Sequence, residues 1–258
     1  MIRILRADMA RLRKSTSFRL SLLGMLVLSI LFMIMQATGM DYTVPLSRVI
    51  FLPMSMYGVA MAAFISVFVG TDFNDGFIRN KLLAAEHRCN LVVSQIIVSC
   101  MGCLIIYIAI TVFTAVVGRF FFEDNVNQAV FFRYFILGIG MSLVTGCIFS
   151  VITMLCGSKT TAILWCMGLA FGMLFLCLHT NEILVQTAYK NGAPNPRYVS
   201  GFRRELCGIL HDLNPCGQAA QLSGWEVWHP VRELLFNCIL IIGLPTVCCM
   251  LFRRKDIY

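Results

Sequence analysis

The stretch LVVSQIIVSCMGCLIIYIAITVFTAVVG, residues 91–118, decides the fold because it runs for 28 residues without a charged side chain. A helix that crosses the hydrocarbon core of a bilayer needs about 20 mainly apolar residues. Within lipid, every backbone N–H and C=O must be bonded inside the segment, as in a helix. The stretch therefore predicts a transmembrane helix, long enough to tilt or bend.

Five further apolar runs accompany it, at residues 18–38, 49–70, 134–155, 162–178 and 234–252. None of the six contains Asp, Glu, Lys or His, and Arg19, at the edge of the first, can extend its head to water. The run at 162–178 is short, with 17 residues. Only 13% of the chain is charged, about half the usual fraction. We expect an all-α integral membrane protein with six transmembrane helices, forming a single transmembrane domain over residues 1–258.

The residues before the first run predict an amphipathic helix in the membrane interface. Ile2, Leu5, Met9 and Leu12 recur at helical spacing, and basic residues occupy the other faces. A frayed tail is the alternative. A cleaved signal peptide is a further alternative, but the apolar run exceeds the 7–15 residues of such a peptide and lacks a clear cleavage site. We therefore expect a retained first span.

The Lys and Arg residues give the orientation. With the N-terminus inside, the inner segments hold 13 of the 21 Lys and Arg residues and five acids, and the outer segments hold eight of each. The whole net charge of +8 then lies inside. This distribution predicts cytoplasmic N- and C-termini and contact with anionic membrane lipid, and it leaves no basic excess that would indicate nucleic acid.

The long outer connection, residues 179–232, is rich in proline and contains Trp225 and Trp228. We expect short re-entrant helices here, capped by Asn214 and Pro215 and covering the outer mouth before helix six. A floppy loop is an equal alternative for residues 181–200. Cys207 and Cys216 both fall in this connection, so a disulfide between them is one option in an oxidising exterior, and two free thiols are the other.

The sequence offers little for catalysis or metal binding. All four histidines lie outside the predicted spans, so no nucleophile has a histidine partner within the membrane. Cys207, His211 and Cys216 match no zinc spacing. CGSKTT, residues 156–161, lacks the GK pair of a phosphate loop, because Ser158 separates Gly157 from Lys159. We therefore expect no catalytic residues, no metal site and no cofactor in this chain.

A polar island interrupts the apolar chain at GTDFNDGFIRNKLLAAEHRCN, residues 70–90. Thr71 or Asp72 could cap a helix there, and the charge order along it suits the helix dipole. Phe73 and Phe77, four residues apart, would project from one face. A docking soluble subunit would explain exposed aromatic side chains on a charged helix; the alternative is that these rings rest in the lipid headgroups.

These features together resemble the permease subunits of ABC-2 type transporters, most of all the bacterial permeases for export of, and self-immunity to, peptide antibiotics. The resemblance rests on the order of loose motifs over the whole chain: the basic lead-in helix, six spans, DGFIRNKLLAAEHRC after the second span, HDLNPCGQ before the sixth, and the terminal FRRKDIY. It implies a multi-pass protein of the bacterial cell membrane.

The resemblance also implies partners and site residues. The coupling helix that docks on a separate ATPase subunit would comprise Asp72, Phe73, Asp75, Phe77, Arg79, Lys81, Glu86 and Arg88. Asn214, Pro215 and Gly217 would belong to the re-entrant outer helices. ATP and Mg would be bound by the ATPase subunit, and a second permease copy, identical or not, would complete the exporter. A channel or scaffold without an ATPase and an intramembrane hydrolase remain the alternatives.

Overall fold

The computed structural model describes residues 2–39, 44–77, 88–190 and 193–253. The chain is almost entirely helical, and its elements are α1 (Ile2–Lys14), α2 (Thr16–Thr38), α3 (Ser47–Ile50), the 3₁₀ helix η1 (Leu52–Met56), α4 (Tyr57–Asn74), α6 (Arg88–Gly118), α7 (Gln128–Cys156), α8 (Lys159–Val185), β1 (Tyr189–Lys190), β2 (Ala193–Pro194), α9 (Phe202–Leu213), α10 (Pro215–Ser223) and α11 (Pro230–Arg253).

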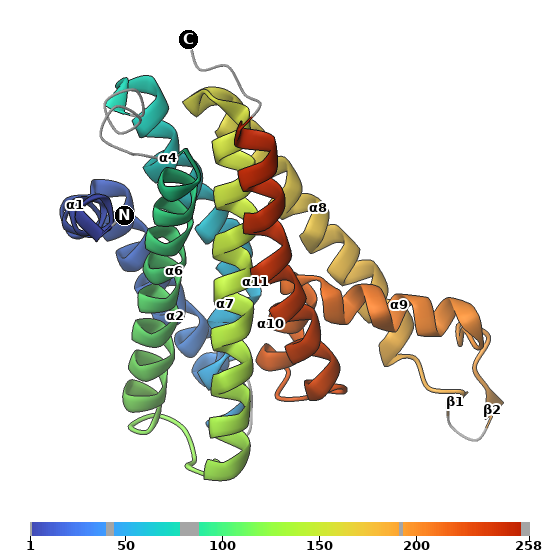
Figure 1. Cartoon of the computed structure of the whole chain (residues 1–258). Coiled ribbons are helices and arrows are strands. Elements are labelled where there is room, and N and C mark those ends of the chain that lie inside the picture. The colour runs from blue at the N-terminus through green and yellow to red at the C-terminus, as the bar shows by residue number, and fades with distance from the viewer. Residues whose placement is uncertain (1, 40–43, 78–87, 191–192, 254–258) are drawn as a thin grey trace.

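Six of these segments are long and apolar enough to cross a membrane, which confirms the predicted number of spans. They are α2, the segment from α3 to α4, α6, α7, α8 and α11. Figure 1 shows them side by side, with α1, the end of α4 and the end of α11 at one end of the bundle, here called the α1 end. The α6–α7 connection and the start of α11 lie at the opposite end.

The second span is not one continuous helix. Its first part forms α3 and η1, with Pro53 in the first turn of η1, and the regular helix begins at Tyr57. Proline lacks the N–H that an α-helix interior requires, so the regular ladder starts after it. The prediction of an unbroken helix from residue 49 was therefore wrong for its first turns.

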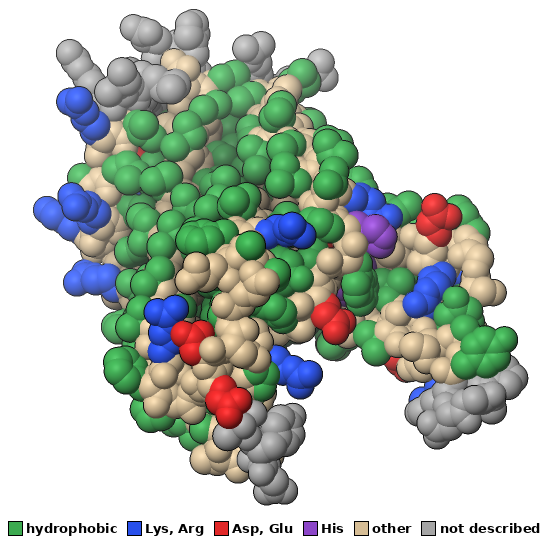
Figure 2. Space-filling model, turned by 90° about the horizontal axis from the view of Figure 1, so that it is seen from below, with side chains coloured by type: hydrophobic (Ala, Val, Ile, Leu, Met, Phe, Trp, Pro, Cys, Tyr) green, Lys and Arg blue, Asp and Glu red, His purple; other side chains and the backbone are tan. Residues whose placement is uncertain are grey.

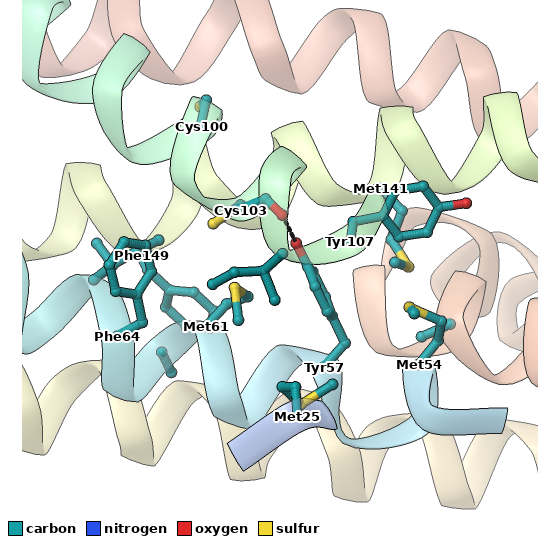
Figure 3. Close-up of a cluster of buried hydrophobic side chains, with 14 of the residues drawn as sticks. Met25, Met54, Tyr57, Met61, Phe64, Cys100, Cys103, Tyr107, Met141 and Phe149 are labelled. Carbon is teal, nitrogen blue, oxygen red and sulfur yellow. Dashed lines mark hydrogen bonds between the residues drawn. The ribbon is translucent and has the colours of Figure 1, made fainter. Parts of the chain in front are cut away.

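The core lies between α2, α4, α6 and α7 and is rich in methionine and aromatic side chains (Figure 3). Met61, Phe64 and Phe149 pack together there, and thioether and aromatic groups fill irregular gaps well. The hydroxyl of Tyr57 donates to the Cys103 carbonyl oxygen at 2.7 Å, which satisfies a buried polar group. The span containing α4 is 67% buried, whereas α11 is only 11% buried, so α4 is a central helix and α11 a peripheral one.

The amphipathic helix α1 forms as predicted and lies across the flank of the bundle near the α1 end (Figure 1). Leu12 is fully buried, and a Cβ built at Gly102 of α6 would lie 3.3 Å from its Cδ1 atom. A larger residue at position 102 would therefore clash with Phe64 of α4, whose ring lies 2.9 Å from such a Cβ, and would also crowd α1. Leu12 belongs to the apolar face that was predicted from the sequence, so this face of α1 packs on the bundle.

The outer connection folds back as the predicted short helices. Asn214 caps α10, because its Oδ1 accepts from the Cys216 N–H at 3.1 Å, and Pro215 occupies the first turn. The side-chain amide of Asn214 also donates to the Met173 carbonyl oxygen at 2.7 Å. Met173 lies halfway along the 27 residues of α8, so the α9–α10 corner reaches the middle of a span.

One predicted boundary was wrong. The fifth span does not end at residue 178, because α8 continues to Val185, where Arg204 donates to the carbonyl oxygens of Ile183 and Leu184 at 3.1 and 2.7 Å. A distant arginine thus bonds carbonyl groups that a helix end leaves free. Beyond it, β1 and β2 pair in antiparallel register, within the segment for which a floppy loop was an equal alternative.

Candidate functional site

Two regions of the described structure gather polar side chains. The first is the α1 end, where α1 meets the end of α4. Arg11 of α1 forms a salt bridge with Asp72 of α4, and its guanidinium also donates to the Phe68 carbonyl oxygen. The same guanidinium lies 4.5 Å from the centre of the Phe68 ring, in a cation–π contact. Asp72 is 1% exposed, so this buried carboxylate fixes α1 to α4.

A second polar contact joins α1 to α6. Asp8 is buried, and the Ser94 hydroxyl donates to its Oδ2 atom at 3.3 Å. Asp8 and Arg11 are three residues apart and lie on the same side of the helix. The amphipathic helix is therefore held at two points, on the two spans that flank the polar island.

The island itself differs from its prediction. Neither Thr71 nor Asp72 begins a helix, because α4 continues to Asn74 and Asp75 is its C-cap. Phe73 is half-buried and packs against the core, so it is not the exposed side chain expected from the sequence. Phe77 is 52% exposed and does present its ring at the surface.

The structure gives no side-chain contacts for the other predicted coupling residues. Arg79, Lys81 and Glu86 lie outside the described residues, and Arg88 is the first residue of α6. Among the described coupling residues, the structure thus brings Asp72 into the protein and leaves Asp75 and Phe77 at its surface.

The second region is a set of polar side chains at the α9–α10 corner, all buried except the partly exposed Arg232, and it is here called the corner cluster. Its members are Thr180, His211, Asp212, Asn214, Gln218, Gln221, Arg232, Glu233 and Asn237. They come from α8, α9, α10 and α11, with Asn214 at the corner itself. Asp212 is fully buried at its centre, where Arg232 Nε donates to Oδ2 at 2.6 Å and Gln221 Nε2 donates to Oδ1 at 2.8 Å.

Amide groups extend the cluster into the bundle. Gln218 and Asn237 form a reciprocal pair at 2.9 and 3.1 Å, which ties α10 to α11. A Cβ built at Gly140 of α7 would lie 2.8 Å from the Asn237 side-chain nitrogen, so the glycine leaves room for this approach. Gln218 also donates to the backbone oxygen of Asp212 at 2.7 Å. Such a connected set specifies one packing of four helices.

His211 is fully buried, and its Nδ1 atom lies 2.8 Å from the hydroxyl of Thr180. The hydroxyl donates its single proton to the Leu176 carbonyl oxygen at 2.8 Å, so the hydrogen-bond network assigns the Nδ1–H tautomer. Nε2 has no hydrogen-bond partner. Burial lowers the pKa of His211 from its ordinary value of 6.5, against the opposing effect of Asp212.

Glu233 completes the cluster from the first turn of α11. It is 1% exposed, and neither carboxyl oxygen has a hydrogen-bond partner. A buried carboxylate without donors is costly, and such groups mark functional positions in membrane proteins. The corner cluster therefore holds unsatisfied polar atoms on two helices, α9 and α11.

The sequence reasoning missed this cluster. It placed all ionisable groups outside the apolar runs, and Glu233 immediately precedes the run at 234–252. The available signal was the amphipathic pattern of residues 202–213, which indicates a helix with one face packed on protein. Asn214, Pro215 and Gly217 do lie at the corner, where Gly217 packs against the backbone of His211.

Cys207 and Cys216 are free, buried thiols on α9 and α10, so the disulfide option is not realised in the structure. Cys216 instead packs where a Cβ at Gly58 of α4 would lie 2.9 Å from its sulfur, and Cys177 of α8 donates to its carbonyl oxygen. Burial raises the pKa of Cys216 to about 12, which keeps it a protonated thiol. No group of three His, Cys, Asp or Glu side chains in the described part of the chain could hold a metal ion.

Comparison with known proteins adds no family to these observations. The chain matches no family model, and no curated protein sequence is significantly similar to it. The site must therefore be interpreted from its own chemistry.

Proposed function

We propose that this protein is the membrane-spanning permease subunit of an ATP-driven exporter of the ABC-2 type. In this proposal a separate ATPase subunit docks on the segment between α4 and α6, and the cargo is an amphipathic, peptide or lipid-like molecule. The main observation in support of this proposal is the junction of α1, α4 and α6, where Arg11 contacts Asp72 and Ser94 contacts Asp8.

The junction supports the proposal mechanically. A soluble partner bound between residues 75 and 88 would act on the ends of two spans that α1 already links. Phe77 supplies an exposed aromatic side chain at the start of this segment, and aromatic residues are common anchors in protein interfaces. Force applied there would reach α4, the most central span, without first deforming a flexible connection.

The charge distribution supports the orientation. The segments at the α1 end carry most of the Lys and Arg residues, so we place both termini in the cytoplasm of a bacterial cell. ATP is available on that side, and it would be bound with Mg by the partner subunit. The α9–α10 corner would then cover the outer mouth.

The peripheral spans support assembly with a second permease copy, identical or not. Within one chain α2 is 17% buried and α11 is 11% buried, so their apolar faces must be covered by lipid or protein. A route between two copies would need no charged residue in the spans. The corner cluster would close this route on the outer side.

The decisive experiment is affinity purification of the tagged protein from its native membranes, followed by an assay for ATPase activity in the purified complex. Phe77→Asp should abolish ATPase co-purification while membrane insertion stays intact. Phe202→Asp is the matched control, because Phe202 is 78% exposed on α9, away from the α1 end. ATPase that co-purifies equally with native protein and Phe77→Asp would refute docking at this site.

The absence of any ATPase from the native complex would favour a channel or membrane scaffold. In that case Phe77→Asp would change no interaction, and transport would continue in ATP-depleted membrane vesicles. Loss of transport on ATP depletion supports the exporter. These two readouts separate the functional classes before the cargo is known.

A further inference from the structure

We infer that a cavity beneath α1 binds one anionic phospholipid, with its phosphate at Arg6 and Arg13 and an acyl chain along α6. The cavity has a volume of about 480 Å³ and is lined by Leu5, Arg6, Met9, Ala10, Leu12, Arg13, Phe18 and Ile105. Its volume is within the range of about 300–1,000 Å³ that is usual for ligand sites. The inference concerns lipid binding alone and holds whether or not an ATPase docks on the chain.

The roof of the cavity is a rigid helix. Arg11 and Asp8 fix α1 to α4 and α6, and Leu12 is buried against Gly102. The cavity therefore does not depend on a loosely lying amphipathic helix. Its walls are apolar except for the two arginines. The lining therefore consists of an apolar slot and a cationic edge formed by Arg6 and Arg13.

The cationic edge has a regular spacing. Arg6, Ala10 and Arg13 follow one another at i, i+4 and i+7 on one face of α1, and all three are exposed. The two arginines are about 10 Å apart along the helix axis. Ala10 between them has only a methyl group, which leaves room for a headgroup. Arginine binds phosphate oxygens in a two-pronged geometry, so the pair suits a phosphodiester.

The depth of the cavity matches a lipid. The 31 residues of α6 extend for about 46 Å, so each end projects about 8 Å beyond a hydrocarbon core of about 30 Å. Ser94, which holds Asp8 of α1, is about 9 Å from the start of α6. This places α1 at the boundary between headgroups and hydrocarbon. Ile105 is about 16 Å farther along, near the membrane middle.

Charge decides which lipid is bound. Lys and Arg side chains project along the edge of the molecule where α1 lies, while hydrophobic side chains cover much of the face in view (Figure 2). The described residues that line the cavity include no acid to balance Arg6 and Arg13. A zwitterionic headgroup would bring a positive charge to this edge, whereas phosphatidylglycerol brings only the phosphate. An anionic glycerophospholipid is therefore the occupant that fits.

The test is titration of delipidated full-length protein in detergent with phosphatidylglycerol or phosphatidylcholine, with bound lipid counted by native mass spectrometry. The native protein should prefer phosphatidylglycerol. Arg6→Gln with Arg13→Gln should weaken its binding by about 25-fold, because each arginine contributes about fivefold. Lys14→Gln with Arg19→Gln changes the charge equally at two exposed positions outside the cavity and should leave this first site intact.

A second variant tests the acyl-chain slot. Ile105→Trp fills the apolar part of the cavity without changing any charge, so it should also reduce phosphatidylglycerol binding. Inorganic phosphate at the same concentration should not compete, because it has no acyl chain. Unchanged binding in either the arginine variant or Ile105→Trp, or equal competition by inorganic phosphate, would overturn the inference. If the arginine variant does not fold, Ile105→Trp decides it.

Discussion

Arg232 at the start of α11 donates from Nε to the carboxylate of Asp212 on α9 at 2.6 Å, and this carboxylate is fully buried while the arginine is partly exposed. The two residues belong to segments that the sequence separates by α10. Their contact joins the re-entrant corner to the last span. An ion pair of this kind is retained only where its surroundings supply further donors, here the side-chain amide of Gln221.

Replacing Arg232 should destabilise the protein strongly. In Arg232→Gln the Asp212 carboxylate stays buried but loses its permanent positive partner, a change that typically costs about 3–5 kcal/mol. Thermal unfolding in detergent measures the loss. Arg203→Gln, an exposed position on the same outer region, is the control and should change the melting temperature little. Equal melting temperatures for the two variants would contradict the proposed contribution of the Arg232–Asp212 ion pair to stability.

The contact between Arg11 and Asp72 should appear as coupling in a double-mutant cycle. We expect Arg11→Ala and Asp72→Asn together to cost less than the sum of the single changes, by about 1–3 kcal/mol. The measurement is unfolding of the four proteins in detergent. Pairing Asp72→Asn with Arg13→Ala, which alters an exposed residue of α1, should give additive effects. Additivity in the Arg11 cycle would show that the junction does not hold α1.

Gly217→Ala should prevent normal packing of the α9–α10 corner. A Cβ at this position would lie 2.0 Å from the His211 carbonyl oxygen, and a backbone atom cannot move aside cheaply. Overpacking of this kind costs about 1–3 kcal/mol and sometimes more. Gly172→Ala on α8, where a Cβ meets nothing within 4 Å, is the matched control. Similar melting temperatures for the two alanine variants would rule out the close approach.

The stability of the protein should fall in mild acid because of His211. Burial lowers its pKa below the ordinary value of 6.5, so the unfolded chain binds a proton more readily than the folded protein. The contribution of neutral His211 to the free energy of unfolding is fully present above about pH 6.5. It is lost as the pH falls through the lowered pKa of the folded protein. Melting temperatures measured from about pH 7.5 to about pH 5 should drop more steeply for the native protein than for His211→Asn.

Asparagine is a suitable replacement because its amide nitrogen can take the place of Nδ1 as donor to Thr180. His179→Asn is the control, since His179 is the neighbouring exposed residue on α8, and this variant should keep the native pH profile. Parallel profiles for native protein and His211→Asn would exclude His211 as the titrating group.

Sequence pattern was sufficient for the spans because the bilayer imposes one simple condition on each of them. The runs near residues 18–38 and 91–118 match α2 and α6 closely, since length and absence of charge identify a spanning helix without reference to its neighbours. The cap at Asn214 and Pro215 was equally local, because a cap depends on residues within one turn.

Boundaries that depend on distant side chains were not predictable in the same way. The end of α8 is bonded by Arg204, 19 residues beyond Val185, and the end of α4 is covered by Arg11, which belongs to the N-terminal helix. Local propensity could not indicate either contact. The polar island was therefore assigned a helix start where α4 in fact continues.

By itself, the sequence determined an all-α membrane protein with six spans, an amphipathic lead-in helix and a capped pair of outer helices, since each follows from periodicity, length or a cap within one turn. Tertiary structure alone decided that Asp72 faces Arg11 and that His211, Asp212 and Glu233 gather beside α8 and α10. The physical reason is that burial of a charge is set by the groups folded against it, and those groups are distant in the chain, as Arg11 is 61 residues from Asp72.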